Sequence, residues 1–322
     1  MQPEIDRWLA THTWAMRDWD AHDVAAGAAT KRQTVAVVLP ALNEEATVGT
    51  IVDAIRSHLV RGAGLVSDLV VVDSGSTDAT ASIAAEAGAR VVSRTDVLPD
   101  VPVRPGKGEA MWRGLAATTA DIVVFIDADL QSFTADYVAA LVGPLVSDPA
   151  LHLVKAIYER PLVAGESVIP AGGGRVTELV ARPLLNQFWP ELAGVVQPLA
   201  GEYAGRRTLL ESLPFPCGYG VEIALLVDTF ERHGLGAIGQ VDLGVRVHRH
   251  HDDQGLGVMA AEILDTAIRR LPGHVARQQA ELLQFERTAH GYHAMARTLA
   301  ITERPPLAQL RYGRDAATRF DL

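Results

Sequence analysis

Cysteine is almost absent from the chain, which has one, Cys217, among 322 residues. A single thiol can neither close an internal disulfide nor build a thiolate metal site by itself, so the sequence favours a reducing compartment and no redox role. Apolar runs are also short, because none reaches the ~18 residues that a membrane-spanning helix needs. The N-terminal residues MQPEIDRWLATHTW include acidic side chains and lack the apolar segment of a signal peptide. We therefore predict a cytoplasmic protein with no membrane partner.

Basic residues are outnumbered, with 29 lysines and arginines against 39 acidic side chains and a net charge of −10. A chain with this much negative charge is a poor general binder of the phosphate backbone of nucleic acids. We therefore predict no nucleic-acid partner. A local basic pocket for a small anion is compatible with this balance. Apolar residues make up 48% and charged residues 21% of the chain, close to the globular average, which excludes collagen, coiled coil and bulk disorder. The length fits one large domain with an extension, or two domains.

Short apolar runs alternate with segments of helical spacing along the first half of the chain. The predicted strands are 34–39 (stopped by Pro40), 69–72, 90–92, 122–126 and 151–158, and the predicted helices are 44–57, 79–87 (capped by Thr77 or Asp78), 108–117 and 137–146. This alternation predicts an α/β fold with a mostly parallel sheet covered by helices on both faces. Such sheets bind ligands beyond the carboxyl ends of their strands.

The alternation weakens beyond about residue 165. There the sequence predicts a flexible loop at 170–174, helices at 175–185, 221–233 and 260–270, and a strand at 243–248. The last fifty residues are polar, and a helix with a loose tail is predicted for them. The second half is therefore expected to be more mixed than the first.

Two carboxylates, Asp127 and Asp129, follow the apolar strand that ends at Ile126. If the strand continues, they lie on the same side, where they would suit Mg²⁺ or Mn²⁺ with phosphate oxygens completing the shell. A solvated turn is the alternative, since two aspartates at this spacing are common. Their place after a buried strand in an α/β order favours the metal site.

Two polar turns, 40–45 and 73–78, follow the first two predicted strands and so lie at the same edge of the sheet. Their carboxylates and backbone groups could hold a base and a ribose. Ordinary turns with helix caps are the alternative, and that interpretation suits Thr77 and Asp78 best. Asp73 ends a strand and is the better candidate for binding.

Two basic loops could hold anions. In 104–109, Lys107 stands between glycines at a helix start, which resembles a phosphate cradle without the spacing of a P-loop. In 172–177, three glycines precede Arg175, so that backbone N–H groups and a guanidinium fork would meet a small anion. For 104–109, a plain surface loop is an equal alternative. For 172–177, a hinge loop is an equal alternative.

The segment 248–253 is dense in possible metal ligands. A zinc site of His248 and His250 lacks nearby cysteines, and one histidine joining the metal of Asp127 and Asp129 is more economical.

Glu222 opens a strongly apolar helix. It is either a favourable charge at the helix N-terminus or an acceptor for a sugar hydroxyl.

Together these motifs resemble a known family. PALNEEATV, VVDSGSTDAT and FIDADL resemble nucleotide-sugar glycosyltransferases of the GT-A fold, which is Rossmann-like. VPVRPGKGEAMWRGLAA, GGGRVTELVARPLL, QPLAGEYAGRR and GYGVEIALLVDTF are more specific and are similar to the glucosyl-3-phosphoglycerate synthases, which begin glucosylglycerate and methylglucose-polysaccharide synthesis. The resemblance covers roughly residues 35–249, and it implies a GT-A fold with a smaller mixed acceptor-binding part and a homodimer.

The resemblance also implies roles for single positions. The donor site would include Pro40, Leu42, Glu44, Ser74, Lys107, Asp127, Leu199, Tyr219, Glu222 and His251, where the family often has arginine, with Asp73 as our own addition. The acceptor 3-phosphoglycerate would be held by Gly174, Arg175 and Thr177, and a divalent cation, Mg²⁺ or Mn²⁺, by Asp129 and His248. The predicted catalytic residues are Asp127, Asp129, Glu222 and Lys107.

The implied activity is that of a retaining hexosyltransferase, which moves glucose from UDP-glucose or another nucleotide sugar to the 2-hydroxyl of 3-phosphoglycerate. The sequence offers no clear carboxylate nucleophile, which favours attack from the leaving group's own face over double displacement. The alternatives are a mannosyl-3-phosphoglycerate synthase using GDP-mannose, a polyprenyl-phosphate sugar transferase and a non-catalytic nucleotide-sugar-binding regulator.

Four segments are predicted on this basis. They are an N-terminal extension at 1–30, a nucleotide-sugar-binding domain at 31–160, an acceptor-binding and catalytic part at 161–255, and a C-terminal helical extension at 256–322 that could make dimer contacts.

Overall fold

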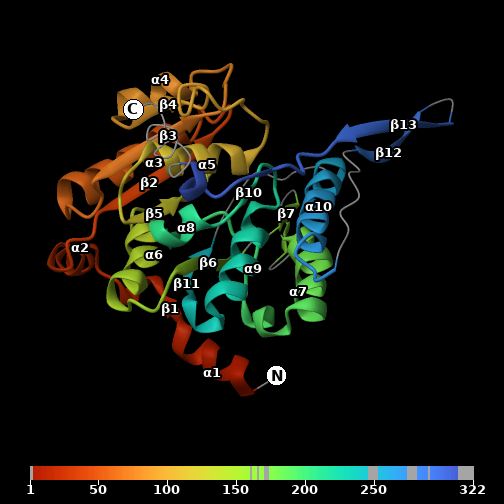
Figure 1. Ribbon diagram of the computed structural model, residues 1–322. Coiled ribbons are helices and arrows are strands. Elements are labelled where there is room, and N and C mark those ends of the chain that lie inside the picture. The colour runs from red at the N-terminus through yellow and green to blue at the C-terminus, as the bar shows by residue number, and fades with distance from the viewer. Residues whose placement is uncertain are drawn as a thin grey trace, which may run out of the picture.

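An eight-stranded sheet organises the chain in the computed structural model, which describes residues 3–159, 162–164, 167–169, 174–245, 253–273, 281–288 and 291–310 (Figure 1). The strands lie in the order β1 (Thr13–Ala15), β11 (Ile238–Val245), β6 (Leu153–Glu159), β9 (Tyr203–Arg206), β5 (Ile122–Phe125), β2 (Val35–Ala41), β3 (Asp68–Asp73) and β4 (Arg90–Ser93). All neighbours are parallel except β9, which is antiparallel to both β5 and β6. The predicted mostly parallel α/β fold is confirmed.

Helices cover this sheet and extend the second half of the chain. They are α1 (Pro3–His12), α2 (Ala21–Thr30), α3 (Val48–Ile55), α4 (Thr80–Ala87), α5 (Lys107–Ala117), α6 (Asp136–Ser147), α7 (Arg182–Phe188), α8 (Arg207–Ser212), α9 (Val221–His233) and α10 (Asp253–Ile268). π-Helical turns at Arg56–Gly62 and Thr177–Ala181 continue α3 and precede α7. None of the helices in the described part of the chain is long and apolar enough to cross a membrane.

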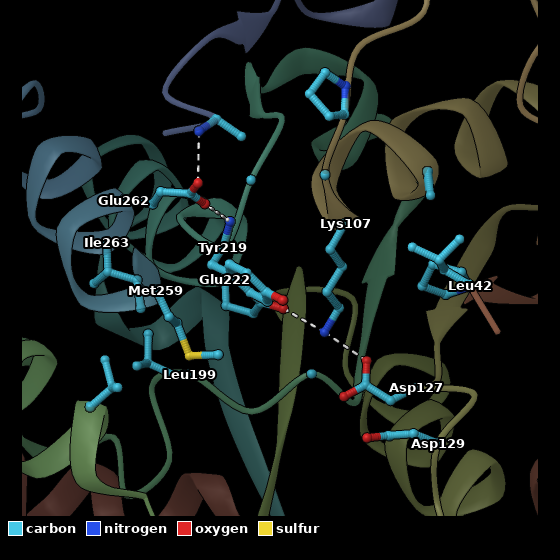
Figure 2. A pocket seen from close by; sticks show the side chains of 18 of the residues that line it. Leu42, Lys107, Asp127, Asp129, Leu199, Tyr219, Glu222, Met259, Glu262 and Ile263 are labelled. Atoms are coloured by element: carbon cyan, nitrogen blue, oxygen red, sulfur yellow. Dashed lines mark hydrogen bonds and ion pairs between the residues drawn. The ribbon is translucent and has the colours of Figure 1, made fainter. Parts of the chain in front are cut away.

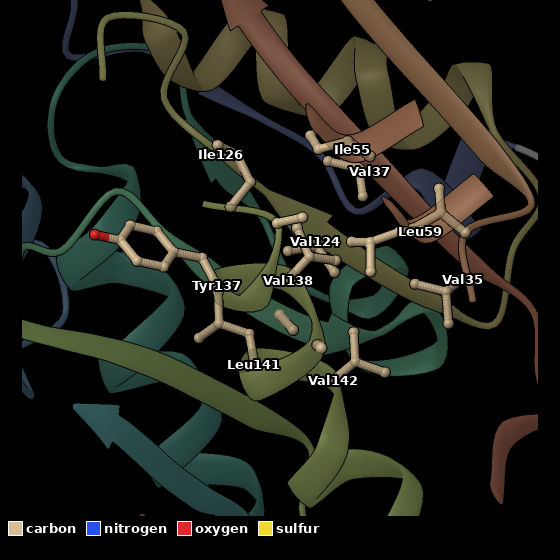
Figure 3. Close-up of a cluster of buried hydrophobic side chains, with 14 of the residues drawn as sticks. Val35, Val37, Ile55, Leu59, Val124, Ile126, Tyr137, Val138, Leu141 and Val142 are labelled. Atoms are coloured by element: carbon tan, nitrogen blue, oxygen red, sulfur yellow. The ribbon is translucent and has the colours of Figure 1, made fainter. Parts of the chain in front are cut away.

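Alternating side chains of β2 separate the two faces of the sheet. Val35, Val37 and Leu39 belong to a buried cluster that includes side chains of α3 and α6 (Figure 3). Val38 points to the other face, into a cluster with α5. Burying each of these side chains contributes about 1.5–3 kcal/mol relative to leaving it exposed. A strand that is apolar at every position is therefore stable only between two layers of helices.

Pro40 does not stop β2, contrary to the sequence prediction, because the strand runs on to Ala41. The carbonyl of Ala41 accepts the N–H of Ser74 on the β3 side. Since consecutive residues of a strand direct their backbone groups to opposite neighbours, Pro40 faces the β5 side, where β5 has already ended at Phe125. The N–H that proline lacks has no partner strand there, so its absence costs no ladder bond.

The helix predicted for 44–57 begins later than expected, as α3. The N–H groups of Glu44 and Glu45 are bound instead by side chains after β3, Thr80 Oγ1 at 2.8 Å and Asp78 Oδ2 at 3.2 Å. Asp78 also accepts the N–H of Thr80, the first residue of α4, but the N-cap position is Ala79, so neither Thr77 nor Asp78 is the N-cap that was predicted. These bonds join the two polar turns into one structure at the sheet edge.

The last part of the chain differs most from the sequence prediction of a helix and a tail. It forms an antiparallel hairpin of β12 (Glu281–Thr288) and β13 (Gly291–Thr298), and then β14 (Glu303–Arg304), which pairs with β10 (Phe215–Pro216). Exposure alternates from 281 to 285, where Leu282 and Gln284 are half-buried and Leu283 and Phe285 are exposed, but polar and apolar residues do not alternate in the sequence, which concealed the strand. Figure 1 shows the hairpin extending away from the body.

Other boundaries move by a few residues. The predicted strand 243–248 begins at Ile238, and its last described residue is Val245. α10 begins at Asp253, before the predicted 260. The short strands β7 (Leu162–Ala164) and β8 (Ser167–Ile169) pair with each other, and the loop predicted at 170–174 lies outside the described residues except for Gly174. The N-terminal segment adds β1 to the sheet beside β11.

Candidate active site

A cavity of about 770 Å³ opens at the carboxyl ends of β2 and β5, where a parallel sheet is expected to bind its ligand. Most of the donor and acceptor residues predicted from the sequence line it: Pro40, Leu42, Glu44, Ser74, Lys107, Asp127, Asp129, Gly174, Arg175, Thr177, Leu199, Tyr219 and Glu222. These residues come from the carboxyl ends of three strands, from the starts of three helical segments and, for Leu199, from the segment before β9. The fold therefore brings together positions that span most of the chain.

Asp73 is the described donor candidate that does not reach the pocket lining. Its carboxylate accepts the backbone N–H groups of Gly75 and Ser76, both at 3.2 Å, and so closes the turn in which it stands. Its neighbour Ser74 lines the cavity. Arg94, which sequence reasoning missed, also lines the cavity after β4.

Lys107 lies at the centre of the pocket, between two carboxylates (Figure 2). Its Nζ is 2.6 Å from Asp127 Oδ1 and 2.8 Å from Glu222 Oε1. Burial alone lowers the pKa of this ammonium, but Asp127 and Glu222 outweigh that effect and hold the pKa well above its usual value. Lys107 is thus a permanent cation, and three of the predicted catalytic residues form one ion-paired group.

The glycines on either side of Lys107 explain how the helix start is fixed. A Cβ at Gly106 would overlap the carbonyl oxygen of Cys217, and one at Gly108 would overlap that of Pro216. The sequence predicted that the backbone at these glycines would approach a phosphate. In the structure it approaches the backbone of residues 216–217. The absence of side chains lets α5 begin against this segment, which places Lys107 in the pocket.

A second lysine, Lys155 of β6, is buried beside this group, and sequence reasoning missed it. Its Nζ donates to the carbonyl of Ala200 at 3.0 Å and lies 4.7 Å from the ring centre of Tyr203. Burial, with a smaller effect from Lys107, lowers its pKa to about 8, although Glu222 opposes this. The chain contains three lysines, so two of them are at this site. The available signal was a lysine within an otherwise apolar strand.

The carboxylates of Asp127 and Asp129 both point into the pocket (Figure 2). Carboxylate oxygens at a strand end suit Mg²⁺ or Mn²⁺, so these residues fit the predicted cation. Within the described residues no group of three or more possible ligands occurs. His248 and His251 lie outside the described residues, so the metal role of the one and the donor role of the other stay predictions.

The candidate acceptor residues stand at the start of the helical segment that leads into α7. Gly174 has a φ of +80°, a left-handed conformation that favours glycine, and its carbonyl accepts the N–H of Glu178. Thr177 is buried, whereas Arg175 is exposed and borders the cavity. Both residues therefore line the pocket, Arg175 from an exposed position and Thr177 from a buried one.

The C-terminal part of the chain supplies a wall of the pocket, which the sequence did not suggest. Leu256, Met259 and Ile263 of α10 line the cavity, and so do residues 298–300 at the end of β13. Figure 2 shows Met259 and Ile263 at this wall. The three α10 residues have the spacing of one helical face. That apolar stripe was visible in the sequence, but nothing local indicated that it faces a pocket and not the core.

Comparisons with known proteins find relatives over most of this chain. Residues 36–172 match the family model described as "Glycosyl transferase family 2". The glucosyl-3-phosphoglycerate synthase of Mycolicibacterium smegmatis is 48% identical over 95% of this chain and 98% of its own, and that of Mycobacterium tuberculosis (strain CDC 1551 / Oshkosh) is 55% identical over 80% and 79%.

Solved structures of the M. tuberculosis synthase are similar as well. The complex with Mn²⁺, UDP and phosphoglyceric acid has a TM-score of 0.81 and 49% identity over 91% of this chain and 95% of that one. The complex with Mg²⁺ and UDP has a TM-score of 0.83 and 48% identity over 93% and 99%.

Proposed function

Since the chain belongs to the glucosyl-3-phosphoglycerate synthase family, we propose that it moves glucose from UDP-glucose to the 2-hydroxyl of 3-phosphoglycerate with retention of configuration. The observation that carries the proposal is one pocket that contains the turns after β2 and β3, the Lys107 group and the helix start at 174–177. A related synthase has been solved with UDP and glucosyl-3-phosphoglycerate, so GDP-mannose is not favoured as the donor. No observation favours the polyprenyl-phosphate transferase or the regulator.

Asp129 is proposed to hold a divalent cation together with His248. Solved relatives contain Mn²⁺ or Mg²⁺ with UDP, and the carboxylates at the end of β5 fit such an ion. When bound, the cation supplies positive charge that neutralises the departing diphosphate. Lys107 adds a second, fixed positive charge, which Asp127 and Glu222 hold in position before any substrate arrives.

Attack from the leaving group's own face is the proposed route. Asp127 and Glu222 are paired with Lys107, and Glu262 accepts two backbone N–H groups, so these three carboxylates have other partners than an anomeric carbon. In this route the bond from the anomeric carbon to the diphosphate oxygen breaks as the bond to the acceptor oxygen forms. The acceptor's hydroxyl proton passes to the departing phosphate oxygen, so no protein nucleophile is needed.

The segment roles are proposals of the same kind. Residues 31–160 would bind the nucleotide sugar, 161–255 the acceptor, and 256–322 would contribute to a homodimer in the cytoplasm. The last segment also contributes α10 and residues 298–300 to the pocket.

A donor-by-acceptor matrix with metal removal tests the proposed reaction. UDP-glucose, GDP-glucose and GDP-mannose are offered with 3-phosphoglycerate or glycerate, before and after treatment with EDTA. We expect the fastest transfer from UDP-glucose to 3-phosphoglycerate, its loss in EDTA and its return with Mg²⁺ or Mn²⁺. Asp129→Ala should not recover with metal. Full activity in EDTA, or rejection of UDP-glucose alongside brisk use of GDP-mannose, would contradict the proposal.

Arg175→Ala tests the acceptor site. A charge-assisted hydrogen bond contributes about 1.5–3 kcal/mol, which corresponds to about one to two decades in affinity. The KM for 3-phosphoglycerate should rise by about that factor, while the Kd of UDP measured by calorimetry stays the same. Arg182→Ala is the matched control, because Arg182 pairs with the exposed Glu178 away from the cavity. Weakened UDP binding with a normal acceptor KM would place the acceptor elsewhere.

A further inference from the structure

We propose that Glu262 of α10 is a positioning residue for glucosyl transfer, which fixes the Tyr219 loop and the C-terminal wall of the pocket relative to each other. The inference rests on the proposed function. Glu262 is 4% exposed, and its two carboxylate oxygens face backbone donors from different parts of the chain. Oε2 accepts the N–H of Tyr219 at 2.8 Å, and Oε1 accepts the N–H of Ala300 at 2.7 Å (Figure 2).

The loop around Tyr219 is shaped to lie directly on α10. A Cβ at Gly218 would overlap Glu262 Oε2, and a Cβ at Gly220 would overlap Thr266 Oγ1. Glu262 and Thr266 are one helical turn apart, and both are buried. Neither glycine has a positive φ, so the requirement for glycine comes from close approach and not from backbone conformation. α10 is thus a platform on which this loop rests.

α10 can affect the reacting centre through the loop around Tyr219, which packs on it and leads into α9. Tyr219 borders the cavity, and Gly220 immediately precedes α9, whose first turn carries Glu222. Glu222 in turn is ion-paired with Lys107. A displacement of the loop would therefore move Tyr219 and the start of α9 together, at the sugar side of the pocket.

A carboxylate has the chemistry for this task, because an ionised carboxylate only accepts hydrogen bonds and can serve two N–H groups at once. Glutamine can keep one of these bonds, but its amide nitrogen is a donor and would face the second N–H. Alanine keeps neither. The expected order of effect is therefore Glu262→Ala larger than Glu262→Gln.

Kinetics and amide hydrogen exchange together test the inference. We expect Glu262→Ala to lower kcat about tenfold or more, Glu262→Gln to have a smaller effect, and the Kd of UDP to change less than twofold, because the turns after β2 and β3 do not contact Glu262. Exchange measured by mass spectrometry should show faster exchange at Tyr219 and Ala300. Gly218→Ala, which pushes a methyl group against the same carboxylate, should reproduce the loss in kcat.

Asp265→Ala is the matched control, since Asp265 lies on the same helix and pairs with Arg269 outside the cavity. It should keep its kcat. Faster exchange at both amides with unchanged kcat would overturn the inference, and so would an equal loss in Asp265→Ala, which would indicate a general effect on α10. If wild-type protein transfers no glucose, the proposed function fails, and the exchange result still decides whether Glu262 fixes the two segments.

Discussion

Lys107→Met is expected to lower kcat/KM for glucosyl transfer by about two to three orders of magnitude, the loss typical of removing one preorganised electrostatic group from an active site. Methionine has a similar length but no charge. Asp127 and Glu222 would then lie at the proposed diphosphate site without the cation that lies between them. Both the departing charge and the two carboxylates would lose their stabilising partner.

The measurement is steady-state kinetics with UDP-glucose as the varied substrate, together with thermal unfolding to establish that the variant is folded. The chain offers a matched control in Lys31, whose ammonium donates to the carbonyls of Val146 and Ser147 away from the cavity. Lys31→Met should keep its activity. A folded Lys107→Met protein with less than a tenfold loss would show that this cation does not act on the reaction.

Arg304→Ala is expected to lower the free energy of unfolding by about 3–5 kcal/mol, because it removes one partner from a buried ion cluster. Arg304 Nε and Nη2 lie 2.5 and 2.7 Å from the two carboxylate oxygens of Glu109, which also binds Arg113 at 2.7 Å. The Arg304 guanidinium lies 5.2 Å from the ring centre of Trp112. Without it, Glu109 keeps a buried charge with a single cationic partner.

The pH dependence of this loss follows from the titration of Glu109. Burial raises the pKa of this carboxyl, but the hydrogen bonds and charges of Arg304 and Arg113 outweigh it and hold the pKa below its ordinary 4.5. The stabilisation is therefore complete above pH 4.5 and is lost as the pH falls through the folded value. The difference between wild type and Arg304→Ala should shrink over that range.

Chemical denaturation at pH 7 and at lower pH measures both effects. Arg90→Ala is the control, because Arg90 and Asp68 form an ion pair whose side chains are 45% and 26% exposed. Such a pair contributes about 1 kcal/mol or less. If both variants lost the same free energy of unfolding, the buried Glu109 cluster would contribute no more to stability than an exposed ion pair.

The parallel core could be predicted from the sequence because its strands are buried on both faces and so read as continuous apolar runs, as at 122–126. Their carboxyl ends then located the polar turns and the two aspartates. The hairpin at 281–298 could not be predicted in this way, because it buries little and its strands are stabilised chiefly by pairing with each other.

The parts of the site that escaped sequence analysis depend on long-range packing. Glu109 and Arg304 are 195 positions apart, and no local pattern relates them. A lysine within an apolar strand was visible in the sequence, but its place in the site follows only from the pairing of β6 with β9 and from the contacts of Lys155 with Ala200 and Tyr203. Glu262 reads as an ordinary helix-surface residue until the loop around Tyr219 is placed against it.

Residues 298–300 line the pocket and Arg304 anchors the same segment to α5, and this arrangement sets an order in which the site is assembled during synthesis. Chains fold from the N-terminus as they leave the ribosome. The turns after β2 and β3 and the aspartates after β5 are synthesised long before the pocket wall at 298–300 and the buried Arg304. A nascent chain would thus form the turns after β2 and β3, which line one side of the pocket, before the opposite wall exists. The site is therefore complete only after residues 298–304 have been synthesised and Arg304 has docked against Glu109 of α5.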